Sequence, residues 1–206
     1  EMNAPLEAAI VQAELTEVEG NAELRNFSVN GGAAVFRTWC AQCHQAGAQG
    51  AKGYPNLLDD DWLWGGDIQA IRDTIAHGVR AEDDDDTRIS EMPAFGDILE
   101  DKQIAAVTQH VLAISGAEHD AAKAAEGAVV FEENCAACHA EDGSGDRDQG
   151  APNLTDAIWL YGGDAETIET TVTNSRYGMM PSWTSRLSEA EIRQVAVYVH
   201  GLGGGE

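Results

Sequence analysis

The amino-acid sequence predicts an all-α fold of two tandem domains that follow an N-terminal helix. Apolar residues recur at the spacing of helices, and no segment shows the alternation typical of a strand. The pattern Gly-x3-Phe-x3-Cys occurs at residues 32–40 and again at residues 127–135. Because the two copies lie a domain length apart within 206 residues, we interpret the chain as a duplication of one domain.

Further matches extend this repeat. The motif Trp-Leu-x-Gly-Gly-Asp begins at Trp62 and at Trp159, and Met-Pro occurs at Met92 and at Met180. The offset between the copies goes from 95 to 97 and then to 88 residues, so the second copy gains two residues in its first loop and loses nine before Met-Pro. We expect a linker near residues 115–119 and three parts: an N-terminal helical extension at 1–27, a first domain at 28–117 and a second domain at 118–206.

The helices follow in chain order. Residues 6–25 have the apolar spacing of an amphipathic helix. Each repeat is then predicted to contain a helix, a loop, a short helix, a second loop and a terminal helix. These helices lie at 32–40, 67–78 and 100–115 in the first copy and at 121–135, 164–175 and 188–202 in the second. Ser188 followed by Glu191 predicts a capping box at the start of the last helix.

The pentapeptide Cys-x-x-Cys-His occurs twice and uses every cysteine of the chain, Cys40, Cys43, Cys135 and Cys138. It is the attachment signal for c-type haem: two thiols add to the two vinyl groups of one porphyrin, and the following histidine binds the iron. We therefore expect two covalent haems, with His44 and His139 as iron ligands. A pair of zinc knuckles is the alternative, but the remaining histidines do not recur at matching positions.

A methionine thioether is a common sixth ligand in electron-carrying haems because it favours Fe(II). Met92 lies 48 residues after His44, and Met180 lies 41 residues after His139. We predict that each methionine serves the haem of its own repeat. Met179 is the alternative to Met180, but the repeat aligns Met180 with Met92. The two sets of ligands predict domains of the class I cytochrome c type.

Several other residues are candidates for contact with haem. A ligating imidazole donates its second N–H to an acceptor, and the spacing offers the carbonyls of Pro55 and Pro152. Gly32 and Gly127 would let the terminal helix cross closely beside Phe36 and Phe131. Tyr198 could face the haem, whereas its repeat partner His110 is expected to pack rather than bind iron. Candidate partners of the haem propionates are Trp64, Tyr161, Arg80, Arg88 and Arg176.

The charge is strongly acidic, with 36 Asp and Glu against 12 Lys and Arg and a net charge of −24. Such a chain does not favour nucleic acid or anionic lipid, and it would attract a basic protein partner. Solubility in a salty environment would leave the same composition. The run Glu82–Asp86 is either a solvated loop or a docking patch for a basic cytochrome. No apolar run is long enough to span a membrane, and no signal peptide or constellation for bond-making chemistry is seen.

Residues 40–57, with Trp62-Leu63-Trp64-Gly65-Gly66, resemble the dihaem subunit III of cbb3-type cytochrome c oxidases. So do Met92-Pro93-Ala94-Phe95-Gly96 and residues 151–156, and the resemblance covers residues 5–202. It implies two His/Met haems in tandem cytochrome c domains at the periplasmic side of a membrane oxidase. It also implies electron relay from a donor cytochrome c to the monohaem subunit and on to the catalytic subunit, without catalysis by this chain itself.

The family's N-terminal membrane anchor is missing from this sequence, so we expect either a portion of an anchored protein or a free relative. A free-standing soluble periplasmic dihaem carrier is therefore one alternative function. A dihaem redox enzyme is another, but it would need an iron with an open sixth position, which the paired Met-Pro motifs argue against.

Overall fold

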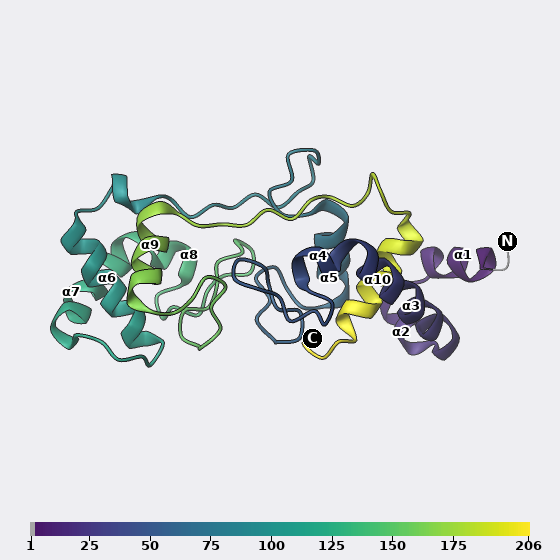
Figure 1. Cartoon of the computed structure of the whole chain (residues 1–206), viewed down its shortest axis with the longest axis horizontal. Coiled ribbons are helices and arrows are strands. Elements are labelled where there is room, and N and C mark those ends of the chain that lie inside the picture. The colour runs from purple at the N-terminus through teal and green to yellow at the C-terminus, as the bar shows by residue number, and fades with distance from the viewer. Residues whose placement is uncertain (1–2) are drawn as a thin grey trace. The chain divides into compact units, whose positions relative to one another are not determined.

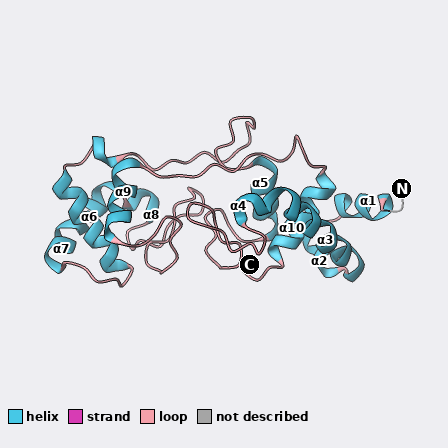
Figure 2. Cartoon of the chain, viewed as in Figure 1, coloured by secondary structure: helices cyan, strands magenta, loops and turns pink. Residues whose placement is uncertain are grey.

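The structure, a computed structural model, describes residues 3–206 and consists of helices joined by loops (Figure 2). Within this range there is no β-strand, only isolated bridges, which confirms the all-α prediction. No helix among these residues is long and apolar enough to span a membrane. The elements are α1 (Ala4–Gln12), α2 (Leu15–Gly20), α3 (Ala22–Val35), the π-helical turn η1 (Phe36–Cys40), α4 (Ala41–His44), α5 (Ile68–His77), the 3-10 turn η2 (Phe95–Asp97), α6 (Asp101–Ile114), α7 (Ala121–Asn134), α8 (Ala136–His139), α9 (Ala165–Asn174) and α10 (Glu189–His200).

The N-terminal extension is broken into separate helices rather than one helix over 6–25. Glu14 forms a capping box with Glu17 at the start of α2. The Asn21 side chain accepts hydrogen bonds from the first turn of α3, so a third helix begins at Ala22. That helix runs through the expected boundary at residue 27. Residues 1 and 2 of the expected extension lie outside the described range.

The chain divides into two compact units that differ from the expected tandem domains at 28–117 and 118–206. Unit 1 contains the chain up to Ile89 together with Gly178–Glu206, and unit 2 contains Ser90–Tyr177. Helix α10 packs on α3 and α5 in unit 1, whereas α6 packs on α7 and α9 in unit 2 (Figure 1). Each unit therefore takes its terminal helix from the other repeat. We call this arrangement the helix exchange.

The helix exchange is possible because the two repeats offer nearly the same surface to a terminal helix. A Cβ atom on Gly32 would collide with the carbonyl of Gln194 in α10, and one on Gly127 would collide with the carbonyl of Ala106 in α6. Both crossings thus bring backbone against backbone at the same repeat position. The same close crossing would let either terminal helix pack on either first helix, as in domain swapping between identical elements.

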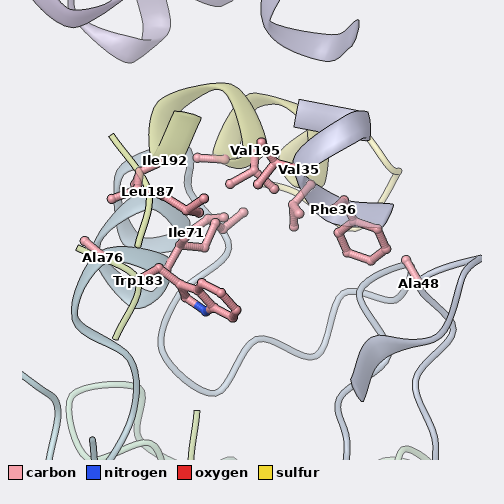
Figure 3. Close-up of a cluster of buried hydrophobic side chains, with 12 residues drawn as sticks. Val35, Phe36, Ala48, Ile71, Ala76, Trp183, Leu187, Ile192 and Val195 are labelled. Carbon is pink, nitrogen blue, oxygen red and sulfur yellow. The ribbon is translucent and has the colours of Figure 1, made fainter. Parts of the chain in front are cut away.

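Each unit has its own apolar core. In unit 1, Phe36 and Val35 meet Ile71 and Ala76 of α5 and Ile192 and Val195 of α10, with Trp183 beside them (Figure 3). The core of unit 2 is formed by Phe95, Ile104, Val107, Val111, Leu112, Val130, Phe131, Ile168 and Val172. A smaller cluster in unit 1 joins the extension to α10 through Ile10, Leu15, Val18, Ile68 and Val197.

The motif Trp-Leu-x-Gly-Gly-Asp shapes the start of the middle helix in both units. Its aspartate caps that helix: the Asp67 carboxylate accepts from the N–H groups of Gln69 and Ala70, and Asp164 accepts from that of Thr167. Its second glycine, Gly66 in unit 1, lies against the indole ring of the motif's tryptophan, where a Cβ would not fit. The capping box predicted at Ser188 is confirmed at the start of α10.

Candidate haem sites

Each Cys-x-x-Cys-His signal forms a short helix, α4 or α8, directly after a longer one. The first cysteine of each signal packs on the core of its unit, Cys40 in unit 1 and Cys135 in unit 2. Burial, with a smaller contribution from the second cysteine, raises the pKa of Cys40 and of Cys135 to about 11. The first thiol of each signal, Cys40 or Cys135, thus lies in apolar surroundings that suit the edge of a porphyrin ring.

The histidine of each signal is held by a proline carbonyl. The Nδ1 atom of His44 lies 3.0 Å from the carbonyl oxygen of Pro55, and that of His139 lies 3.1 Å from that of Pro152. These are the hydrogen bonds that the spacing predicts. With Nδ1–H donating, Nε2 is the ring atom left to bind iron. Burial lowers the pKa of both histidines, partly offset by the proline carbonyls, so the neutral imidazole that a metal requires is favoured.

The two Met-Pro motifs are exchanged along with the terminal helices. Met180 packs against the core of unit 1, and unit 1 is the unit that contains His44. Met92 packs against the core of unit 2, the unit that contains His139. This differs from the pairing of each methionine with its own repeat. The reason is that the chain passes from one unit to the other just before each Met-Pro. Met179, the alternative ligand, is 63% exposed.

The backbone of each methionine is fixed by the loop after the middle helix. In unit 1, Val79 and Met180 exchange two backbone hydrogen bonds of 2.9 and 3.0 Å. In unit 2, the Ser175 hydroxyl donates instead to the carbonyl of Met92. Ser175 was not among the residues singled out from the sequence, and its place at the repeat position of Gly78 gave no sign of this role.

The aromatic residues beside each site follow the same exchange. The ring centroids of Phe36 and Tyr198 are 5.5 Å apart, and those of Phe131 and His110 are 5.1 Å apart. Burial lowers the pKa of His110, with a smaller opposing effect from the backbone of Ala124. In the structure His110 therefore packs against a phenylalanine in the place where unit 1 has Tyr198.

The candidate propionate partners form one matched arrangement in each unit. The Arg88 guanidinium stacks on Trp64 at 5.5 Å and donates to Thr74 Oγ1 at 2.7 Å. The Arg176 guanidinium likewise stacks on Tyr161 at 4.9 Å and donates to Thr171 Oγ1. Arg80 differs, because its Nε–H donates to the carbonyl of Gly178 at 2.8 Å, close to Met180. A role in binding propionates stays a prediction for all five residues.

The acidic run Glu82–Asp86 is exposed except at one residue. Glu82, Asp83, Asp85 and Asp86 lie at the surface, whereas the Asp84 side chain is only 10% exposed and accepts a hydrogen bond from Ser182 Oγ at 2.8 Å. A docking patch on this loop therefore rests on the four exposed carboxylates.

The donor atoms in each unit fit a covalently attached, six-coordinate haem c. Each unit supplies two thiols, one oriented imidazole and one thioether, and two of these four side chains, the first cysteine and the methionine, lie against a single apolar core. Thioether bonds hold the macrocycle, and imidazole and thioether are the axial ligands of cytochromes c.

Known proteins are similar to this chain along nearly its whole length. The family described as “Cytochrome C oxidase, cbb3-type, subunit III” matches residues 28–111 and 122–199, once for each repeat. The “Cbb3-type cytochrome c oxidase subunit CcoP” of Cereibacter sphaeroides is 60% identical over 208 residues, covering all of this chain and 72% of that protein. The subunit of the same name from Rhodobacter capsulatus is 53% identical over 216 residues, covering all of this chain and 73% of that protein.

A third relative, the “Cbb3-type cytochrome c oxidase subunit FixP” of Sinorhizobium medicae, is 47% identical over 190 residues, covering 92% of this chain and 66% of that protein. The two family matches span most of the chain, and the relatives are similar along nearly its whole length. The chain belongs to the family of subunit III of cbb3-type cytochrome c oxidases.

Proposed function

We propose that the chain is a dihaem electron relay of a cbb3-type oxidase. One haem c is bound by Cys40, Cys43, His44 and Met180, and the other by Cys135, Cys138, His139 and Met92. The observation that carries this proposal is the repeated geometry: in each unit the haem signal has its histidine held by a proline carbonyl, and its first cysteine packs on the same core as the methionine of a Met-Pro motif. The names and identities of the relatives supply the oxidase.

The side chains of this protein suit electron transfer rather than catalysis. A bound haem supplies an iron that accepts and releases one electron. With haem bound, His44 and Met180 would hold the iron in unit 1 and His139 and Met92 would hold the iron in unit 2, so neither iron would be open to a substrate. The Pro55 and Pro152 carbonyls keep the imidazoles oriented. The apolar cores exclude water, and together with the thioethers they favour Fe(II).

We propose that a basic donor cytochrome c, at the periplasmic side of the membrane, delivers electrons to this chain. From here they pass to the monohaem subunit and then to the catalytic subunit. The net charge of −24 supports a basic donor, because opposite charge speeds the encounter at low salt. Neither the free carrier nor the redox enzyme is favoured by a particular feature of the structure.

Haem count and ligation test this proposal. The intact mass should exceed the 21.9 kDa polypeptide by two haems that acid–acetone does not extract. Met180→Ala and Met92→Ala should each remove one thioether-to-iron absorption band, whereas Met179→Ala should remove none. In the reduced protein, the methyl resonance lost in Met180→Ala should belong to the haem that is bonded to His44, as traced by nuclear Overhauser effects. A link to His139 instead would contradict the exchanged pairing, and a gain of one haem would contradict the dihaem assignment.

A further inference from the structure

The loop after α5 holds the Met180 segment at more points than its backbone bridge alone. Arg80 donates to the carbonyl of Gly178, two residues before Met180, and Asp84 accepts from Ser182, two residues after it. The methionine is therefore fixed on both sides by one loop. This loop is the place where the first repeat is nine residues longer than the second.

The Ser182 hydroxyl has one proton and two acceptors within reach. Ser182 is 3% exposed, and its Oγ lies 2.9 Å from the Ala76 carbonyl and 2.8 Å from Asp84 Oδ2. The Ala76 carbonyl already accepts the backbone N–H of Trp183 at 3.0 Å. The Thr184 hydroxyl, 3.0 Å from Ser182 Oγ, can donate to Ser182 in turn. Asp84 is thus the better acceptor, because hydrogen bonds to a charged group are the stronger ones.

The Asp84 carboxylate is itself held in place. His77 Nδ1 lies 3.2 Å from each of its oxygens, and the backbone N–H of Asp86 donates to Oδ1 at 2.9 Å. Chiefly the Ser182 hydroxyl, and also Asp86 and His77, lower the pKa of Asp84. The carboxylate is therefore a fixed acceptor between α5 and the Met180 segment.

Unit 2 lacks this arrangement. The repeat places Ala94, which has no hydroxyl, at the position of Ser182, and the second loop has no counterpart of the acidic run. Met92 is held by the Ser175 hydroxyl instead. The two methionines thus differ in how they are fixed, although their haem signals match.

We propose that Asp84 is a positioning residue for the Met180 ligand and that it acts through the Ser182 hydroxyl. The inference rests on the proposed ligation of the unit 1 haem by Met180. Without Asp84, the buried hydroxyl loses its charged acceptor and keeps only the shared Ala76 carbonyl, and the Met-Pro-Ser turn loses the contact that ties it to the loop after α5. The thioether then leaves the oxidised iron more readily and yields its place to an added ligand.

The test uses Met92→Ala protein, in which the remaining thioether-to-iron band belongs to Met180. Imidazole is titrated into the oxidised protein, and the loss of this band gives its affinity. Asp84→Ala should tighten imidazole binding by about tenfold, the effect of losing one hydrogen bond to a charged acceptor. Ser182→Ala should give a similar change, and Asp84→Ala should add little to it. Asp84→Asn, which keeps an acceptor oxygen, should restore much of the parent affinity.

The matched control is Asp85→Ala, which removes the same charge from an exposed neighbour. It should bind imidazole like the parent. In Met180→Ala protein, where the band of Met92 remains, Asp84→Ala should change nothing. Equal affinities in Asp84→Ala and Asp85→Ala would overturn the proposal. If Asp84→Ala does not fold, unchanged affinity in folded Ser182→Ala would overturn it equally. Absence of any band in Met92→Ala protein would instead overturn the ligation by Met180, and the positioning role with it.

Discussion

Gly127→Ala tests the helix exchange directly. An ideal Cβ at this position would lie 2.8 Å from the backbone nitrogen of Val107, and nearer still to the Ala106 carbonyl, whereas ordinary contact begins at 3.4 Å. Because both obstacles are backbone and the Ala106 carbonyl is the nearer one, α6 and α7 must separate by well over the roughly 0.6 Å that the Val107 nitrogen alone would require. A gap of about 1 Å forfeits roughly half of the dispersion energy of each atom pair that it opens.

The net cost follows from two opposing effects. Overpacking a close crossing costs about 3 kcal/mol at the upper end of the usual range. Alanine recovers about 1 kcal/mol through its higher helix propensity. The remaining loss of about 2 kcal/mol corresponds to a fall of roughly 10 °C in the unfolding midpoint of a unit this size.

The assay follows thermal loss of the thioether band in two backgrounds. In Met180→Ala protein the band reports on Met92, and in Met92→Ala protein it reports on Met180. Gly127→Ala should lower the midpoint of the Met92 band and leave that of the Met180 band unchanged. A fall of the Met180 band instead would show that α7 pairs with α10 and would refute the exchange. Gly20→Ala, whose Cβ meets nothing within 4 Å, is the control and should lower neither midpoint.

Two further predictions concern the surface and the N-terminal extension. Reduction by a basic cytochrome c should slow steeply with added salt, because the Debye length falls from about 30 Å at 0.01 M to about 8 Å at physiological ionic strength. In stopped-flow measurements, the reduction rate should depend less on salt when Glu82, Asp83, Asp85 and Asp86 are neutralised and Asp84 is kept. A reduction rate that does not change with salt would argue that the charge serves solubility. Asn21→Ala should cost about 1 kcal/mol in chemical unfolding of unit 1, because the first turn of α3 loses its cap; Asn21→Asp, which can still cap, should cost little, and equal losses in both variants would contradict a capping role.

Much of each site could be predicted from spacing because the chemistry there is local. The signals Cys40–His44 and Cys135–His139, and the proline carbonyls 11 and 13 residues beyond them, lie close together in sequence and in space. The ends of the N-terminal helices could not be predicted as well. The apolar spacing continues through Asn21 and predicts one helix there. The Asn21 side chain instead accepts hydrogen bonds from backbone N–H groups and starts a new helix.

The partner of each terminal helix could not be predicted because the repeats are too alike. Gly32 and Gly127 receive α10 and α6 with the same close crossing, so the residues at the interface do not choose between the two pairings. The role of Asp84 was hidden for another reason. It lies among four exposed acids, and only the fold shows that one of the five turns inward toward Ser182.

The division of the chain also sets the order in which the protein can be completed. Unit 2 is one continuous stretch, Ser90–Tyr177, whereas unit 1 needs both flanking pieces. Arg193 donates to the carbonyl of Ala13, and His200 lies 2.6 Å from Glu19, contacts that close loops of 180 and 181 residues. Loops of that length close slowly, and a chain is synthesised from its N-terminus. The haem signal that is made first therefore belongs to the unit that is finished last.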